Sequence, residues 1–223
     1  QAALEARHAA EIANRAQALT LFDNPNEGAI AQGGSTNPPP ATGFVNPVGA
    51  FADRTVGNGC TYATIAAAIS ASSPGDRLRI EGGRTFTENV TINKNLTLQG
   101  GYNGCASSSS ARTTVRGGGS GVVMQITLAP TMTVALENLN ITNGNGSQGG
   151  IRLEVDSGGL TLNQVDIYSN TGTIGGGGLW IGSNAVVTGT NVNIHDNTAS
   201  DYGGGVRLYG GRATFSYSNI YNN

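Results

Sequence analysis

Positive charge is scarce in this chain of 223 residues. It has 12 basic and 14 acidic residues, a formal net charge of -2, and Lys94 as its only lysine. A protein that binds nucleic acid needs a basic surface to neutralise phosphates, so the composition argues against a nucleic-acid partner. Charged residues make up 12% of the chain, against about 25% in an average soluble domain.

Long apolar runs are also missing. No run approaches the roughly 18 residues of a membrane-spanning helix, and no basic start followed by an apolar middle marks a signal peptide. We therefore expect no direct membrane insertion. Because the chain begins at Gln1 without Met and stops at Asn223 inside a repeat, we expect a piece of a longer protein whose ends hold any targeting information.

Cysteine and histidine are too few for a convincing zinc site of four ligands, since only His8 and His195 could supplement Cys60 and Cys105. We predict no metal and no cofactor. Cys60 comes just before a helical segment and Cys105 just after a strand, which could place both near one end of the fold. We expect a disulfide, which implies an oxidising compartment. The alternative is two free thiols.

The composition divides the chain into three parts. Residues 1–22 are rich in Ala, Glu and Arg and predict a helical tail. Residues 23–58 are rich in Asn and Gly and hold most of the prolines, which favours an extended linker. Within residues 59–223, a short amphipathic helix over 61–71 precedes segments of β-branched residues between glycines, which predict short strands.

Two sequence markers share one period in the C-terminal third. An isoleucine recurs at intervals of 26, 27 and 26 residues, at Ile141, Ile167, Ile194 and Ile220. The aliphatic residue after a glycine pair recurs at intervals of 28 and 27 residues, at Ile151, Leu179 and Val206. An asparagine follows the last three isoleucines at a distance of three residues, at Asn170, Asn197 and Asn223, whereas the first copy has Asn143 one residue early.

Self-similarity at a fixed period predicts a repeat architecture, here a right-handed, single-stranded parallel β-helix of the all-β class. The 35 glycines exclude a helical repeat, because each interior Gly costs a helix about 1 kcal/mol relative to Ala. Residues 78–223 give five or six turns, and the helix over 61–71 is placed to cap the first. The asparagines suit a tight bend, because Asn tolerates the left-handed conformation and its amide can bond to the copy above.

These residues resemble secreted bacterial right-handed β-helix proteins of the pectin-lyase-like group. The segment "CTYATIAAAISASSPGDRLRIEGGRTFTENVTINKNLTLQGGYNGC" looks like their capped first turns. The segments "IYSNTGTIGGGGLWI" and "IHDNTASDYGGGVRL" are similar to repeats of polymorphic outer-membrane proteins, which are adhesins exported as autotransporter passengers, although Ile replaces the usual Phe. Over residues 60–223 the resemblance implies a secreted or cell-surface bacterial protein, extracellular or periplasmic.

The aligned repeats do not bring catalytic groups together. A β-helix hydrolase needs two carboxyl groups about 5–9.5 Å apart, but Asp166 aligns with Asn140 and Asn193. A lyase would need a cluster of acidic residues for calcium beside a base such as Arg152 or Arg207. The repeats show no such cluster, so we expect no catalytic residues in this chain.

A residue ladder on the outside is the stronger functional signal. The residue after each glycine-glycine-aliphatic unit faces out, so the alignment stacks Trp180 between Arg152 and Arg207. Strand alternation also points His195 outward, in line with aligned tyrosines rather than paired with Asp166 as an acid and base. Such rows either stiffen the coil or contact a ligand. The candidate ligand-binding residues are Arg152, Trp180, Arg207, Tyr168, His195 and Tyr221.

The sequence therefore favours a non-catalytic extracellular or cell-surface β-helix, active in adhesion or as a scaffold, with a surface glycan or a host or partner protein as its ligand. One alternative is a polysaccharide lyase or glycoside hydrolase whose catalytic residues lie past Asn223. Another is a self-assembling subunit that uses its open last turn, where Ile220 lies, or residues 1–22 of another copy.

Overall fold

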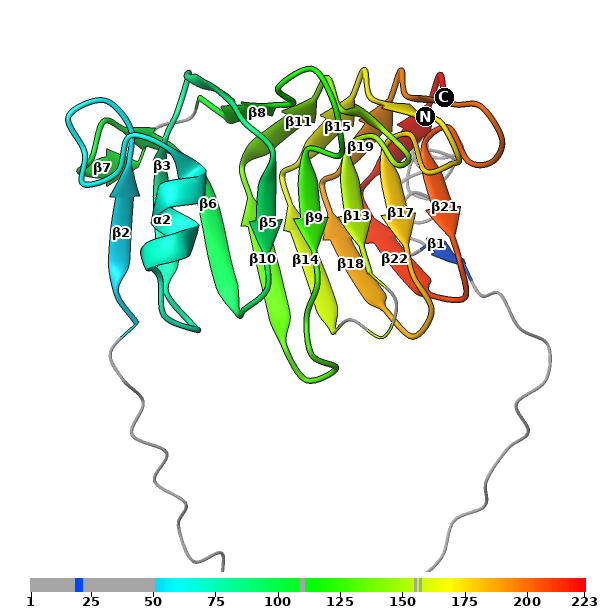
Figure 1. Ribbon diagram of the computed structural model, residues 1–223, viewed down its shortest axis with the longest axis horizontal. Helices are drawn as coiled ribbons and strands as arrows, with labels where there is room; N and C mark the ends of the chain where they lie inside the picture. Colours follow the sequence, from blue (N-terminus) through cyan, green and yellow to red (C-terminus); the bar gives the residue numbers. More distant parts are fainter. Residues whose placement is uncertain (1–18, 22–50, 109–110, 155, 157) are drawn as a thin grey trace, which may run out of the picture.

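The computed structural model describes residues 19–21, 51–108, 111–154, 156 and 158–223. In these residues the chain forms a parallel β-helix of about six turns, and its strands stand side by side along the long axis (Figure 1). The predicted all-β coil is confirmed. No helix in the described part of the chain is both long and apolar enough to cross a membrane.

The strands of the described residues form four sheets, in which strands from successive turns pair in parallel apart from β1 and β7. The nine-stranded sheet contains β1 (Leu19–Leu21), β2 (Asp53–Val56), β3 (Arg77–Glu81), β6 (Leu96–Asn103), β7 (Ser107–Ser108), β10 (Thr133–Glu137), β14 (Gly159–Asn163), β18 (Val186–Thr190) and β22 (Arg212–Ser216). The six-stranded sheet contains β4 (Thr85–Thr87), β8 (Thr113–Arg116), β11 (Leu139–Thr142), β15 (Asp166–Tyr168), β19 (Asn193–His195) and β23 (Asn219–Tyr221). The five-stranded sheet contains β5 (Val90–Ile92), β9 (Met124–Ile126), β13 (Ile151–Leu153), β17 (Leu179–Ile181) and β21 (Val206–Leu208). The three-stranded sheet contains β12 (Asn145–Gly146), β16 (Thr171–Gly172) and β20 (Thr198–Ala199).

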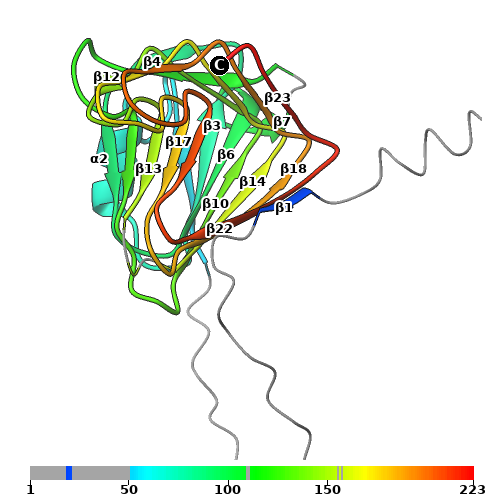
Figure 2. The same ribbon diagram turned by 90° about the vertical axis from the view of Figure 1, so that its right-hand side faces the viewer.

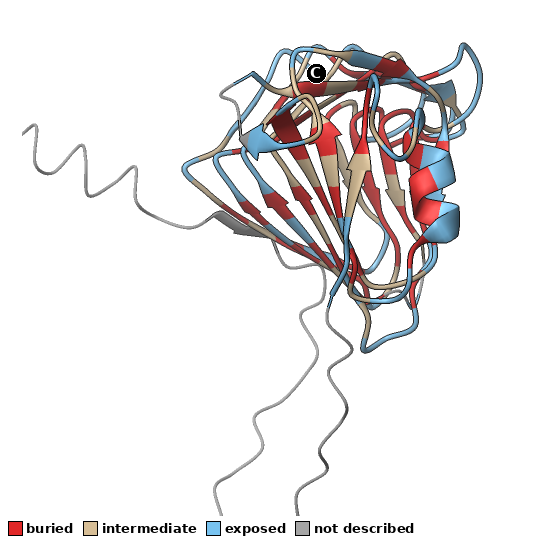
Figure 3. Ribbon diagram, turned by 90° about the vertical axis from the view of Figure 1, so that its left-hand side faces the viewer, coloured by how far each residue is buried: buried red, intermediate tan, exposed pale blue. Residues whose placement is uncertain are grey.

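The coil begins earlier than the expected boundary at residue 59. Residues 53–56, assigned to the linker by composition, form β2, which pairs in parallel with β3. The rest of the expected linker that precedes residue 51 lies outside the described residues. Helix α2 (Ile65–Ala71) follows and contacts β2, β3 and β5, with Ile65, Ala68 and Ile69 buried (Figure 3).

Side chains from the next turn cap both ends of α2. The two carboxylate oxygens of Glu88 accept hydrogen bonds of 2.9 Å from the amides of Ile65 and Ala66 at the start of the helix. At its end, Lys94 Nζ donates to the carbonyls of Ile69 and Ser72 at 3.2 and 3.0 Å. A negative group at the N-terminus and a positive group at the C-terminus both stabilise a helix. The only lysine in the sequence is therefore used to cap this helix.

Residues in equivalent positions of successive turns stack to form the core. The repeated isoleucines are in register, and all but the last are fully buried, at Ile141, Ile167, Ile194 and Ile220. Val165 and Val192, which lie two residues before Ile167 and Ile194, are fully buried as well. In the nine-stranded sheet Gly189 pairs with Phe215, whose ring fills the space that a Cβ on Gly189 would need. Burying each large aliphatic side chain contributes about 1.5–3 kcal/mol.

The predicted asparagine ladder is confirmed, and its hydrogen bonds run from turn to turn. The Nδ2 atom of Asn170 donates to Oδ1 of Asn197, and Nδ2 of Asn197 donates to Oδ1 of Asn223, both at 2.9 Å. Each oxygen also accepts the backbone amide of the asparagine before it, at 3.1 Å. Asn170 and Asn197 are buried.

The expected left-handed conformation falls one residue earlier than the ladder. The residues with φ of 51–52° are those that precede the three asparagines, Ser169, Asp196 and Asn222. In the first copy Asn143 itself has φ of 60°, and the next residue, Gly144, donates its amide to Asn170 Oδ1 at 2.8 Å. Asn143 therefore occupies the bend and Gly144 the ladder position, which explains the shifted first copy.

The second glycine of each pair packs against this ladder. A Cβ on Gly178 would lie 2.9 Å from Asn197 Nδ2, and a Cβ on Gly205 would lie 2.8 Å from Asn223 Nδ2. A side chain at either position would displace the amide. The glycine pairs and the asparagines of the sequence repeat therefore pack against each other in each of these turns, and this is why they share a period.

The C-terminal end of the coil is partly paired. Strand β1 pairs antiparallel with β22, the last strand of the nine-stranded sheet (Figure 2). In the six-stranded sheet Ile220 of β23 is 41% exposed, as expected for the last turn. The helical tail expected over residues 1–22 lies outside the described residues apart from 19–21, where a strand replaces the expected helix.

Candidate functional site

The predicted strip on the five-stranded sheet has the expected register. Arg152 pairs with Trp180, and Trp180 pairs with Arg207, on strands β13, β17 and β21. The guanidinium carbon of Arg152 lies 5.3 Å from the centre of the Trp180 ring. Nε of Arg152 also lies 2.9 Å from Glu154 Oε1, so this arginine is both stacked and ion-paired.

The other half of the expected stack is not formed. Arg207 lies against Tyr202 and Tyr209 instead of Trp180, with ring distances of 4.9 and 5.8 Å. Trp180 itself stacks on Tyr209 at 5.8 Å and is only 7% exposed. The expectation of an exposed Trp stacked between two arginines is therefore wrong, because the ring of Tyr209 takes the place of Arg207 against the indole. Because so little of Trp180 is exposed, its side chain offers almost no surface to a ligand.

Sequence reasoning missed Tyr202 and Tyr209. Tyr202 lies in the irregular segment before β21, where no strand period applies, and Tyr209 follows β21 directly. One signal was present, because Tyr209 is two residues after Arg207 and such residues share a face of an extended segment.

The second predicted strip forms a stack of three aromatic rings on the six-stranded sheet. The rings of Tyr168 and His195 lie 5.3 Å apart and 6° from parallel, and those of His195 and Tyr221 lie 4.9 Å apart and 9° from parallel. We call this stack the ring ladder. Its rings pack face to face, so the stack presents a row of ring edges on the surface and the sequence alignment of the three residues is confirmed.

A polar column runs beside the ring ladder on the same face. Asn193 Nδ2 donates to Asp166 Oδ1 at 2.7 Å, and Asn219 Nδ2 donates to Asn193 Oδ1 at 2.9 Å. Asp166 also forms an ion pair with Arg112. In this column the side chains of successive turns satisfy one another's hydrogen-bonding groups along the coil axis.

The single histidine of the described residues pairs with an acid next to it in sequence. His195 Nδ1 lies 2.7 Å from Asp196 Oδ2, and Asp196 occupies the left-handed bend after β19. Asp166, the acid first considered as its partner, is engaged with Arg112 and Asn193 instead. An acid and base pair of His195 with Asp166 is therefore not formed.

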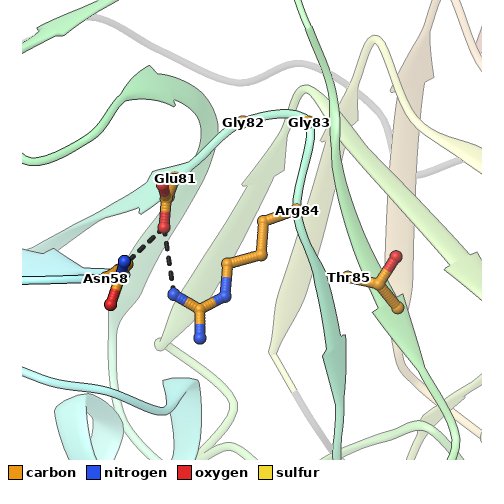
Figure 4. Close-up of a pocket in the computed structure, with 6 residues that line it drawn as sticks. All are labelled: Asn58, Glu81, Gly82, Gly83, Arg84 and Thr85. Carbon is orange, nitrogen blue, oxygen red and sulfur yellow. Dashed lines mark hydrogen bonds and ion pairs between the residues drawn. The ribbon is translucent and has the colours of Figure 1, made fainter.

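The N-terminal end of the coil carries the disulfide and a shallow hollow. Cys60 and Cys105 are bonded, as expected, with their Cα atoms 5.4 Å apart. In the nearby hollow Glu81 Oε2 accepts from the Asn58 amide at 2.7 Å and from Arg84 Nη1 at 3.0 Å (Figure 4). These two hydrogen bonds hold the pKa of Glu81 below its ordinary value. The acid is already satisfied by the protein, so we assign no ligand to this hollow.

The fold and these outward rows define the class of the protein, a parallel β-solenoid with residue ladders on its surface. In comparisons with protein-family models, with curated proteins and with solved structures, no match to the chain was found.

Proposed function

We propose that this chain is a non-catalytic extracellular or cell-surface scaffold that acts in adhesion. The ring ladder of Tyr168, His195 and Tyr221 is the observation that carries the proposal, because it extends over three turns as one continuous row. Solenoids offer extended surfaces of this kind to their partners. The resemblance of the repeats to surface adhesins supports the same function.

The disulfide and the engaged carboxylates also support this proposal. A bond between Cys60 and Cys105 is typical of proteins that work in an oxidising compartment. Beside the ladders, Asp166 is bound by Arg112 and Asn193, and Glu154 by Arg152 and Gln125. Carboxylates that hold neighbouring turns together serve the scaffold, and a hydrolase would need them facing its substrate.

An adhesion assay tests the proposal with a matched pair of variants. The double variant Tyr168→Ala and His195→Ala removes two rings of the ladder, and Tyr217→Ala removes an exposed tyrosine outside it. Binding to immobilised glycans and to extracellular-matrix proteins should fall at least tenfold in the double variant and stay unchanged in Tyr217→Ala. Equal binding by all three chains would remove the ring ladder as the contact surface.

The enzyme alternative has one specific observation in its favour. A carboxylate on one nitrogen of a histidine can orient the other nitrogen as a base, and Asp196 lies at Nδ1 of His195. The test is incubation with acidic polysaccharides, with and without calcium, followed by ultraviolet detection of unsaturated ends and a reducing-sugar assay. The scaffold proposal predicts no turnover. Turnover that disappears in a His195→Gln variant would overturn it in favour of a polysaccharide lyase or hydrolase.

A further inference from the structure

One arginine of the C-terminal turns is held between aromatic side chains at the surface. The guanidinium carbon of Arg207 lies 4.9 Å from the ring centre of Tyr202 and 5.8 Å from that of Tyr209. Its Nη1 atom donates to the backbone carbonyl of Ile174 at 3.0 Å. Tyr202, Tyr209 and Ile174 are 66%, 54% and 48% exposed. We call Ile174, Tyr202, Arg207 and Tyr209 the arginine patch.

Two glycines make room for the Arg207 side chain. A Cβ on Gly175 would lie 2.7 Å from Arg207 Nη1, and a Cβ on Gly203 would lie 3.0 Å from Arg207 Cβ. The guanidinium is therefore positioned by the rings of Tyr202 and Tyr209 and by the Ile174 carbonyl, while the two glycines leave the space that the side chain occupies. A side chain fixed in this way loses little conformational entropy when it binds a further group.

The positive charge of Arg207 has no acidic partner among the residues that the structure describes. Most other arginines there are ion-paired, namely Arg54, Arg77, Arg79, Arg84, Arg112 and Arg152. In the described residues Arg207 uses only Nη1 for a hydrogen bond. Its Nε and Nη2 donors remain for a carboxylate, which a guanidinium binds through two parallel hydrogen bonds.

The neighbours of Arg207 indicate what else the partner carries. Tyrosine and arginine are both enriched at the contact sites between proteins, so exposed tyrosines around an arginine favour a protein partner. Ile174 adds an exposed aliphatic surface, which suits an apolar side chain better than the hydroxyl-rich face of a sugar. We propose that the arginine patch binds an acidic segment of a partner protein, with an Asp or Glu carboxylate on Arg207 and an adjacent apolar side chain on Ile174 and Tyr202.

This inference rests on the adhesive function proposed above and names the partner class for a second surface. The test is an array of 12-residue peptides with a central Glu flanked by Leu, Ile or Phe, each matched by a copy with Gln. We expect binding by Glu peptides, at least tenfold weaker binding by their Gln copies, and a similar loss in an Arg207→Gln variant. Arg212→Gln, an exposed arginine on β22, is the control and should bind like the unmodified chain.

Three results would overturn the inference. The first is peptide binding of equal strength after the Glu→Gln change or in the Arg207→Gln variant. The second is binding of glucuronate oligosaccharides through Arg207 in place of peptides. The third is no peptide binding at all. None of them affects the adhesion and turnover assays, so a failure here is distinct from a failure of the proposed function. Thermal unfolding of Arg207→Gln, expected to match that of Arg212→Gln, checks that the variant is folded.

Discussion

The N-terminal turns, residues 51–106, and the C-terminal turns, residues 138–223, share one fold but join their neighbouring turns differently. In the N-terminal turns the joining side chains are mostly unlike groups, such as Arg54 with Asp76, and a disulfide. In the C-terminal turns they are mostly like groups, such as Asn170 with Asn197 and Tyr168 with His195. A turn with a copy on each side can bind to that copy, whereas the first turn that the structure describes has no earlier copy among the described residues and is joined to the next turn by other chemistry.

Removing one asparagine of the ladder should have the largest effect. Asn197→Ala deletes the acceptor of Asn170 and the donor to Asn223 and to the Ile167 carbonyl. Buried groups left without partners cost about 1–3 kcal/mol each, so we expect a loss of about 3–5 kcal/mol in the free energy of unfolding. Denaturant unfolding followed by Trp180 fluorescence measures this. Asn163→Ala, at an exposed strand end, is the control and should change stability by less than about 0.5 kcal/mol.

Removing the disulfide should have the next largest effect on stability, and it should act on the N-terminal turns of the coil. Cys60 and Cys105 are 45 residues apart, and closing a loop of this size stabilises a fold by about 3–4 kcal/mol. The double variant Cys60→Ser and Cys105→Ser should therefore unfold at lower denaturant, with its earliest loss of hydrogen-exchange protection in β2 and β3. If protection were lost first in β19 or β23, the disulfide would not be what stabilises the N-terminal turns.

Acid should destabilise the N-terminal turns first, because the carboxylate of Asp76, just before β3, binds Ala52 and Arg54 at the start of β2. Burial raises the pKa of Asp76, but hydrogen bonds from the amides of Ala52 and Ser73 and from Arg54 outweigh it, so the pKa lies below its usual value. A carboxyl group with a lowered pKa stabilises the fold above its unfolded pKa of about 3.9, and that contribution is lost as the pH falls through the lower folded value.

We therefore expect the N-terminal turns to lose protection below about pH 4. Asp76→Asn should cost about 2–3 kcal/mol at neutral pH, since hydrogen bonds to a charged group contribute about 1.5–3 kcal/mol. It should also flatten the acid limb of stability against pH. An unchanged acid limb in this variant would show that Asp76 is not the group responsible.

The cap on helix α2 should give the smallest effect. Lys94→Met keeps the aliphatic stem but removes the ammonium group from the carbonyls of Ile69 and Ser72. A cation at a helix C-terminus contributes about 0.3–1 kcal/mol, so the loss should stay within that range. A loss several times larger would mean that the helix end depends on Lys94 for more than its charge.

The sequence predicts the repeating part of the molecule well. The isoleucine period, the inward and outward faces and the asparagine ladder all follow from recurrence, because a fixed period in the chain becomes a fixed position in each turn. The placement of Cys60 and Cys105 around the first turns favoured a disulfide over two free thiols, and the structure contains that disulfide. What repeats can be read without knowing how any single side chain packs.

The parts that do not repeat were harder to predict. The strand β2 comes from a segment without a clear alternation, and its pairing with β3 depends on Asp76 in a later turn. The cover on Trp180 comes from Tyr209, which has no aromatic copy at the equivalent place in the preceding turn. Register could align Trp180 with two arginines, but the direction of each side chain depends on neighbours outside the strand.

Hydrogen exchange followed by mass spectrometry, on the unmodified chain and on Asn197→Ala, tests the central comparison most directly. In a solenoid each turn contacts only its neighbours, so damage to one ladder residue acts first on the adjoining turns. We expect Asn197→Ala to lose protection in residues 165–223 while residues 77–103 keep theirs. An equal loss in both regions, or an earlier loss in residues 77–103, would contradict it.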